Sequence, residues 1–229
     1  MDDPTPRLPL LVLDDDVCFP GTEMTVRVAE PGGRRLIRDL LDLEAEERWM
    51  GIVLPRPDRG ADPLGRREVF PGGTAVRLLG AHLQPDGVSE VRFAGEFRFE
   101  IERELPGDEQ YRRAVVRPLG EVPLAEDDPG VLTVRRRLLD LVEGLLPELG
   151  EQFDLSHDDL AELRGAAPFA LLVNRLAAGL DVPAQRKLEL LLANLPERGE
   201  TVLSILESRR YVLDRLRPWR HLAANPELN

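Results

Sequence analysis

The sequence predicts an α+β fold in which a strand-rich half precedes a helical half. Between positions 8 and 119, apolar residues alternate with polar ones or form short runs between Pro- and Gly-rich turns, as in half-buried strands. From position 131 they recur every three or four residues, as in amphipathic helices. We therefore expect a β-rich subdomain over 8–119, an acidic linker over 120–130, a helical subdomain over 131–220 and a tail over 221–229.

The first half is expected to contain short strands that form a small barrel or sandwich, because strand-like runs recur there at short intervals. One helix interrupts them, since Leu36, Ile37 and Leu40 share a helical face that covers the sheet. Residues 55–65 are rich in Pro and Gly and are expected to form a loop. The expected strands are 8–13, 24–29, 49–54, 74–83, 88–93, 97–101 and 111–117.

The second half is expected to be helical throughout. A long amphipathic helix starts at Val131 and is expected to end near Pro147, because proline lacks the amide that a helix interior needs. Ser156 is expected to cap a short helix, and the acidic residues after it suit a helix N-terminus better than a metal site. Further helices are expected at 168–178, 183–193 and 197–217.

Composition excludes several classes of protein. The 229 residues contain no apolar run of about 20 that could span a bilayer, and the N-terminus does not look like a signal peptide. Cys18 is the only cysteine, which excludes an internal disulfide. A net charge of -12 disfavours binding to a phosphate backbone. We expect a cytoplasmic protein that binds neither membrane nor, in general, nucleic acid.

Residue types for catalysis are nearly absent. The sole lysine, Lys187, lies in no glycine-rich phosphate loop, and its polar neighbours predict a solvated helix face rather than the buried base of a Ser-Lys dyad. The three histidines, His82, His157 and His221, lack the spacing of metal ligands. We therefore expect no catalytic, cofactor-binding or metal-binding residues, and a protein that is not an enzyme.

Three other local patterns are interpreted as structural. Glycines before a helix can present amides to a phosphate, but the GGRR segment at 32–35 has no supporting motif, so its glycines are expected to bend the chain into the helix. The arginines at 135–137 are expected to pair with Asp140 and Glu143 on the same helix. Three aspartates precede Cys18, and their charge predicts a thiol of low reactivity.

Large apolar side chains are the candidate binding residues, although burial in the core is the alternative for each of them. Phe93, Phe97 and Phe99 are assigned to the core by their alternation. An apolar surface near the C-terminal end of the last helix would favour docking to another protein. The candidate binding residues are Phe19, Met24, Trp49, Phe70, Tyr211 and Trp219, and the expected apolar surface at the helix end comprises Tyr211, Leu213, Leu216 and Trp219.

An ordered series of motifs resembles the Lon substrate-binding domain, the N-terminal domain of Lon proteases. The motifs are CFPGTEMTVRVAEP at 18–31, GIVL at 51–54, GTAVRL at 73–78, GEFRFEI at 95–101, YRRAVV at 111–116, AQRKLELL at 184–191, and Arg198. The resemblance covers about residues 8 to 206. Ala29 and the pair Gly32-Gly33 depart from it, because the family usually has aromatic residues there. It implies a PUA-like β-barrel followed by a helical bundle.

The resemblance also implies a function. We expect a stand-alone binding module, without the ATPase and peptidase of Lon proteases, that holds unfolded polypeptide or a specific protein partner in a groove or along a sheet edge. One alternative is a regulatory protein that docks a Lon-type protease or another partner. Another is RNA binding through the PUA-like barrel, which the acidic composition disfavours. The oligomeric state stays open.

Overall fold

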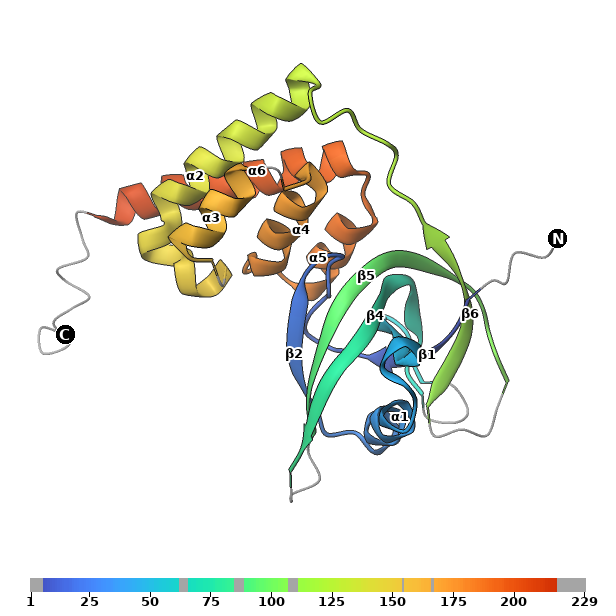
Figure 1. Cartoon of the computed structure of the whole chain (residues 1–229). Helices are drawn as coiled ribbons and strands as arrows, with labels where there is room; N and C mark the ends of the chain where they lie inside the picture. The colour runs from blue at the N-terminus through green and yellow to red at the C-terminus, as the bar shows by residue number, and fades with distance from the viewer. Residues whose placement is uncertain are drawn as a thin grey trace, which may run out of the picture. The chain divides into compact units, whose positions relative to one another are not determined.

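The structure, a computed structural model, describes residues 6–61, 66–84, 89–106, 111–153, 155–165 and 167–217 (Figure 1). Its contacts divide the chain into two compact units. Unit 1 contains Met1–Val122 and Asn174–Asn194, and unit 2 contains Pro123–Val173 and Leu195–Asn229. This division places 174–194 with the strands, whereas the sequence pattern predicts that segment as part of the helical subdomain. The subdomain boundaries drawn from the sequence stay a prediction.

Unit 1 contains a six-stranded sheet in the order β2-β5-β4-β3-β1-β6, and β6 also pairs with β5. These pairings link β1, β3, β4, β5 and β6 into a closed ring, while β2 lies outside the ring on the first half of β5. The α+β class is therefore confirmed. The strands are β1 (Arg7–Val12), β2 (Glu23–Val28), β3 (Trp49–Pro55), β4 (Val69–Leu83), β5 (Ser89–Glu104) and β6 (Arg112–Leu119).

Two strands are longer than expected. Residues 89–93 of one predicted strand and all of the predicted strand 97–101 belong to the single strand β5, and β4 begins at Val69 instead of Thr74. Register shifts in the β4–β5 pair, between Ala75 and Val76 and between Leu78 and Gly80, mark β-bulges that bend both strands. The bends let β5 pair with β2 at one end and with β6 at the other.

Two apolar clusters lie in the described part of unit 1. The first, here called the ring core, comprises Leu8, Leu10, Val53, Ala75, Phe99, Ala114 and Val116. Gly51 makes room for it, because a Cβ there would lie 2.7 Å from Leu10 and 2.8 Å from Phe99. The second, the helix core, comprises Leu11, Leu13, Cys18, Val28, Leu36, Ile37, Leu40, Met50, Ile52, Val76, Leu78, Val91 and Phe93.

Helix α1 (Pro31–Leu41) supplies three buried residues to the helix core: Leu36, Ile37 and Leu40. It begins at Pro31, so Gly32 and Gly33 belong to its first turn and the expectation that they form a bend before the helix is wrong. A Cβ on Gly33 would lie 2.6 Å from Val28 and 3.1 Å from Leu11. The glycine therefore lets the first turn of the helix approach the strands closely.

Helix α5 (Ala184–Leu192) also belongs to unit 1, and polar side chains tie it to the rest of that unit. Lys187 is buried, and its Nζ donates to the Asp16 carboxylate at 2.8 Å and to the Ala178 carbonyl at 2.7 Å. The expectation of a solvated lysine is therefore wrong. Asp16 is 171 residues away in the chain, so the polar neighbours of Lys187 in the sequence did not reveal this partner.

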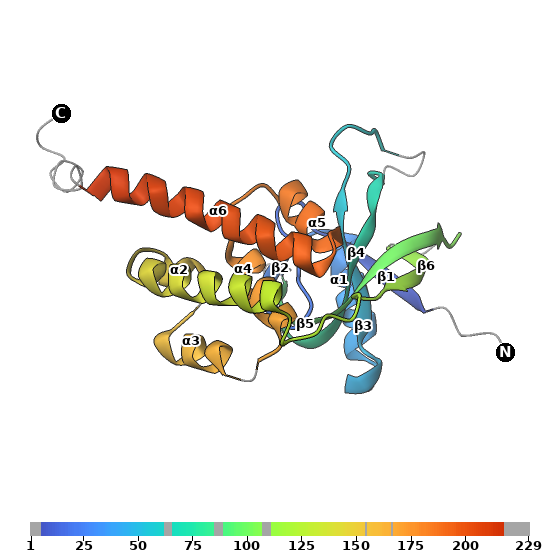
Figure 2. The same cartoon turned by 90° about the horizontal axis from the view of Figure 1, so that it is seen from above.

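Unit 2 contains the long helices α2 (Pro129–Phe153) and α6 (Leu195–Leu216), which pack side by side (Figure 2). Helix α2 continues through Pro147, contrary to the expected end there. Buried Leu145, Leu146 and Phe153 lie on both sides of the proline, and their burial offsets its lost hydrogen bond. Helix α4 (Phe169–Gly179) begins in unit 2, and the division between the units falls after Val173.

Other local expectations for unit 2 are met in part. Helix α3 (His157–Arg164) has the predicted cap. The Ser156 side chain accepts from the Asp159 amide at 3.1 Å, and the Asp159 carboxylate accepts from the Ser156 amide at 2.9 Å. The arginine run does not pair within its own helix as expected. Arg135 instead donates to the Leu163 carbonyl at 2.7 Å, and Arg137 pairs with Glu207 on α6, because neighbouring segments offer closer acceptors.

Candidate functional site

A pocket of about 670 Å³ lies in unit 1 beside the start of β1 and the end of α1. Its walls come from segments far apart in the chain, which the ring of strands brings together. The volume is in the range of pockets that bind small molecules or single side chains of a peptide. The lining residues are Pro6, Arg7, Leu8, Pro9, Asp39, Leu40, Leu43, Glu47, Trp49, Phe97, Tyr111 and Arg113. We call it the Trp49 pocket.

Three aromatic side chains give the Trp49 pocket its apolar wall. The rings of Trp49 and Phe97 lie 6.1 Å apart at a tilt of 38°, and both pack against the ring core. Tyr111 packs against the helix core. All three rings are half-buried. Part of each ring packs against a core, and the remaining part lines the pocket. Such amphipathic rings are typical anchors in binding surfaces.

Hydrogen bonds hold two of these rings in place. The Trp49 indole N–H donates to the Glu46 carbonyl at 2.7 Å. The Tyr111 hydroxyl donates to the Asp39 carboxylate at 3.0 Å, and Arg35 pairs with that carboxylate at 2.9 Å. Because the polar atoms of both rings are already bonded, the faces left to a ligand are apolar ones. The pocket is therefore built before any ligand arrives.

Exposed residues surround this apolar wall. Leu43 is 41% exposed, and the charged side chains of Arg7, Glu47 and Arg113 are exposed as well. An apolar centre with a polar rim of both signs is the usual anatomy of a protein-binding surface. The arrangement can bury one apolar or aromatic side chain while the rim contacts the backbone and charges on either side of it.

The predicted binding residues do not come together. Trp49 lines the pocket, whereas Met24 is half-buried on β2 and Phe70 is half-buried at the start of β4 with the Arg56 guanidinium 5.5 Å above its ring. Phe19 is fully buried, so its assignment to a binding surface is wrong: close packing leaves no face for a partner. Tyr211 is 60% exposed on α6.

Trp219 lies outside the described residues. Of the other residues expected at the end of the last helix, Leu216 is 53% exposed and Leu213 is half-buried. Val212, which is not among the residues expected there, is 50% exposed. The C-terminal turns of α6 therefore present apolar side chains outward in unit 2.

Sequence reasoning missed most of the Trp49 pocket. Phe97 was assigned to the core, and Tyr111, Asp39 and Leu43 were not singled out. Phe93 and Phe99 are fully buried as expected, while Phe97 packs against the ring core but is only half-buried, with its ring beside that of Trp49. Tyr111 begins an expected strand, and an aromatic residue at a strand end was the one available signal.

Burial, more than the neighbouring aspartates, raises the pKa of the Cys18 thiol to about 12. A hydrogen bond involving Thr22 opposes this rise, and the charge of Asp16 adds to it. The thiolate is the reactive form, so Cys18 is chemically inert in the folded protein. In the part of the chain that the structure describes, no group of three or more His, Cys, Asp or Glu side chains is placed to hold a metal ion.

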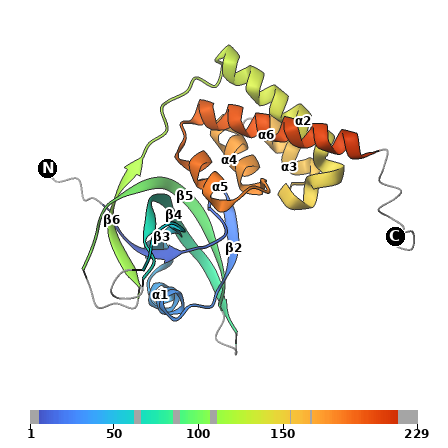
Figure 3. The same cartoon turned by 180° about the vertical axis from the view of Figure 1, so that it is seen from behind.

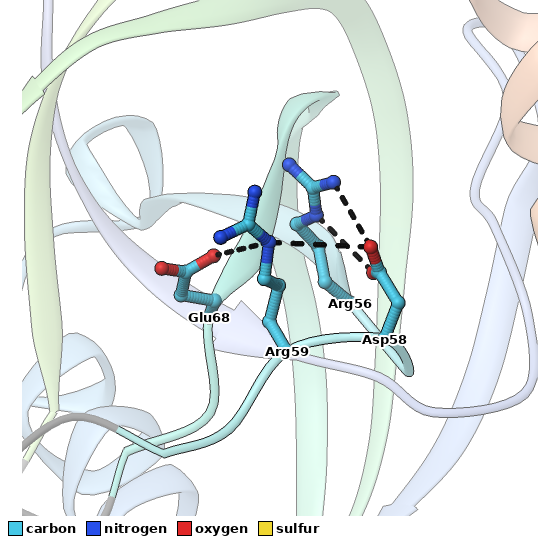
Figure 4. Close-up of polar contacts among 4 residues, drawn as sticks. All are labelled: Arg56, Asp58, Arg59 and Glu68. Carbon is cyan, nitrogen blue, oxygen red and sulfur yellow. Dashed lines mark hydrogen bonds and ion pairs between the residues drawn. The ribbon is translucent and has the colours of Figure 1, made fainter.

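The connection between β3 and β4 carries a separate network of exposed charges (Figure 4). Asp58 lies 3.3 Å from the Arg56 guanidinium and 4.0 Å from that of Arg59, which also lies 3.8 Å from Glu68. The two arginines and the two carboxylates of this network offset each other's charge. None of the described helices combines the length and the apolar character that a membrane span requires.

Comparisons with known proteins agree on one family. Residues 7–208 match the family model described as the ATP-dependent protease La (LON) substrate-binding domain. The Lon protease of Parabacteroides distasonis is 24% identical over 226 residues, which are 97% of this chain and 26% of that protein. The Lon protease of Cytophaga hutchinsonii is 27% identical over 115 residues, 50% of this chain and 14% of that protein. The chain thus spans about a quarter or less of these curated relatives.

Solved structures show the same fold. The N-terminal domain of the Mycobacterium avium complex Lon protease superposes with a TM-score of 0.67 at 16% identity, covering 88% of this chain and 98% of that one. A Lon N-terminal domain protein from Xanthomonas campestris gives a TM-score of 0.58 at 23% identity, covering 87% of this chain and 98% of that one. The ordered motifs, the fold and the family model lead to one conclusion: the chain belongs to the Lon substrate-binding domain family.

Proposed function

We propose that the protein binds unfolded or extended segments of other proteins and anchors an apolar or aromatic side chain of the segment in the Trp49 pocket. Membership of a substrate-binding domain family supports binding to protein. The observation that carries the proposal is the half-buried aromatic wall of Trp49, Phe97 and Tyr111, whose polar atoms are bonded and whose free faces are apolar. The proposed role is binding without catalysis, in the cytoplasm.

The chemistry of the pocket predicts what it selects. An aromatic or long aliphatic side chain would displace water from the apolar wall. Its binding would be stabilised in proportion to the apolar area that is removed from water. Glu47 and Arg113 on the rim are of opposite sign, so no net charge of the segment is strongly favoured. Binding should therefore depend on exposed apolar residues, which unfolded proteins offer and folded ones bury.

The test uses a labelled protein that is kept unfolded by reduction and alkylation of its cysteines, with fluorescence anisotropy as the readout. The Leu43→Asp variant places a charge at the exposed margin of the pocket and should weaken binding by roughly tenfold. Leu132→Asp is the matched control, because Leu132 is 49% exposed on α2 in unit 2 and lines no part of the Trp49 pocket. Equal binding by both variants, or no saturable binding by the parent protein, would contradict the proposal.

Trp49→Ala should weaken binding more, by roughly thirtyfold, because a buried aromatic anchor usually dominates an interface. Trp49 also packs against the ring core, so circular dichroism must show that this variant folds. A variant that folds and binds like the parent protein would remove Trp49 from the proposed site.

A second candidate is docking of another folded protein through α6, by a partner such as a Lon-type protease. The observation that favours it is the outward apolar set on the last turns of α6, where Tyr211, Val212 and Leu216 are each at least half exposed. Changing Val212 and Leu216 to serine separates the two roles. Loss of capture of a purified Lon protease with unchanged binding of unfolded protein would support docking; the reverse result would exclude it.

A further inference from the structure

Strand β2 has an open edge. It pairs with β5 through residues Glu23–Val28, and no other strand in the described part of the chain pairs with it. It is the outermost strand on its side of the sheet (Figure 3). An open edge presents unpaired backbone amides and carbonyls, which can bind the edge of another strand.

The register shows which backbone groups face this edge. The Gly95 amide donates to the Thr22 carbonyl at 2.9 Å, in line with the β2–β5 register. Bonding alternates along an antiparallel strand, so Met24, Val26 and Val28 direct their backbone groups toward β5. The amides and carbonyls of the intervening residues, Glu23, Thr25 and Arg27, are therefore turned to the open side.

The pairing on the other side of β5 gives the same answer. The Leu78 amide on β4 donates to the Arg48 carbonyl, so Leu78 faces β3 and Arg77 faces β5. Arg77 is opposite Ala94, and hence Ala94 faces β4. Its neighbour Phe93 must then face β2, where it is opposite Met24. Two independent registers thus assign the odd-numbered residues of β2 to the open edge.

Apart from its charged side chains, the edge lacks the sequence features that usually block pairing. Residues 23–28 contain no proline, glycine or lysine, and their pairing with β5 shows no register shift that would mark a bulge. The side chains of the even-numbered residues are apolar and contribute to the helix core. The side chains of Glu23, Thr25 and Arg27 are exposed.

The order of these exposed side chains is self-complementary. When two copies of β2 are placed antiparallel about Thr25, Glu23 of each copy lies opposite Arg27 of the other, and the two threonines face each other. In this register each odd-numbered residue of one copy lies opposite an odd-numbered residue of the other. The backbone amides and carbonyls that these residues turn outward can therefore hydrogen-bond to each other across the two strands. On the other face, Met24 lies opposite Val26 of the second copy. Opposite charges and apolar pairs across strands both stabilise such a pairing.

We infer that a second copy of this chain binds at the edge of β2 and forms a two-fold symmetric dimer through antiparallel β2–β2 pairing. The same surface is used by both copies, as in most symmetric dimers. Pairing of one short strand buries little area, so the dimer is weak and depends on protein concentration. The inference does not rest on the proposed binding of polypeptide in the Trp49 pocket.

Charge exchange provides the main test, read by analytical ultracentrifugation over a range of concentrations. Arg27→Glu and Glu23→Arg each place like charges opposite one another twice, and each alone should weaken dimerisation roughly tenfold or more. An equimolar mixture of the two variants restores both opposite pairs and should dimerise like the parent protein. Arg136→Glu is the control: it makes the same charge change at an exposed position of α2, outside β2.

Cysteine cross-linking tests the register itself. Two Thr25→Cys chains should form an intermolecular disulfide on mild oxidation, because directly opposite residues have Cα atoms about 5.5 Å apart. In the same dimer, the Cα atoms of position 27 in the two copies are roughly 14 Å apart, which is too far for a disulfide. The Arg27→Cys variant should therefore not cross-link. Cys18 stays in both variants, since it is buried.

Three results would overturn the inference. The first is a parent chain that stays monomeric at every concentration up to the millimolar range. The second is a dimer that both single charge variants leave unchanged. The third is a β2 edge that binds an extended client peptide while the chain itself stays monomeric. Rescue by the mixed variants together with cross-linking at Thr25 alone would establish the dimer.

Discussion

Arg98 and Arg56 lie in the same unit and both pair with a carboxylate, yet their surroundings differ. The Arg98 side chain is 6% exposed and donates to the carbonyls of Leu191, Ala193 and Gly120, besides pairing with Glu121 at 3.1 Å. The Arg56 side chain is 32% exposed and pairs with Asp58, which is 60% exposed (Figure 4). Water can replace the partners of Arg56 but not those of Arg98, so the two pairs differ in their effect on stability.

The largest expected effect follows from removing the buried guanidinium. Arg98→Ala removes a buried donor from the carbonyls of Leu191, Ala193 and Gly120, and it leaves a cavity in the unit. We expect a loss of about 3–5 kcal/mol in the free energy of unfolding, measured by urea denaturation and circular dichroism. Arg56→Ala is the control and should change it by about 1 kcal/mol or less. Similar losses in both variants would show that burial does not separate the two pairs.

A smaller loss is expected at Lys187, whose side chain is 9% exposed but whose partner Asp16 is 38% exposed. Lys187→Met keeps the volume of the side chain and leaves Asp16 partly hydrated, so the main cost is the unpaired Ala178 carbonyl. We expect a loss of about 1–3 kcal/mol in the same assay. Arg186→Met, at the exposed neighbour that pairs with Glu189, should leave stability nearly unchanged. A result in which the two variants are equally stable would contradict the burial argument.

The contrast between near and distant partners also explains what the sequence could predict. The class and most elements follow from local patterns: alternation marks β2, and Leu36, Ile37 and Leu40 mark the buried face of α1. Lys187 was assigned to solvent because its sequence neighbours are polar, while its partner Asp16 comes from the other end of the chain. Local patterns do not contain that contact.

The Trp49 pocket was hidden for the same reason. The sequence marks Trp49 as a large apolar residue, but the wall that it forms with Phe97 joins side chains from two different strands, β3 and β5. The bond between Tyr111 and Asp39 joins residues 72 positions apart. A pocket whose walls meet only after the ring of strands has closed is not contained in any single motif.

The buried thiol gives a prediction whose size depends on the pH. Folding raises the pKa of Cys18 from 9.0 to about 12, so between these values the unfolded chain has lost a proton that the folded chain keeps. The folded state then binds more protons, and stability is expected to fall as pH rises through this window, by at most about 1.4 kcal/mol per pH unit.

Cys18→Ala supplies the comparison for this prediction, since it removes the titrating group and should flatten the slope of stability against pH above 9. In the parent protein a thiol reagent at pH 8 should modify Cys18 only as fast as the protein opens. Rapid modification of the folded chain, or an unchanged slope in the alanine variant, would show that burial does not control this thiol.

The smallest effect is expected in the exposed charge network. The hydrogen bond from Arg56 lowers the pKa of Asp58 below 3.8, so the pair contributes stability that is present at neutral pH and is lost as the pH falls through this lowered pKa. Because the carboxylate is open to water, the contribution is small, and Asp58→Asn should leave the urea midpoint at pH 7 unchanged within error. Its acid transition below pH 4 should also match that of the parent protein. A clear shift of either would mean that this loop is coupled to the core more tightly than its exposed ion pairs indicate.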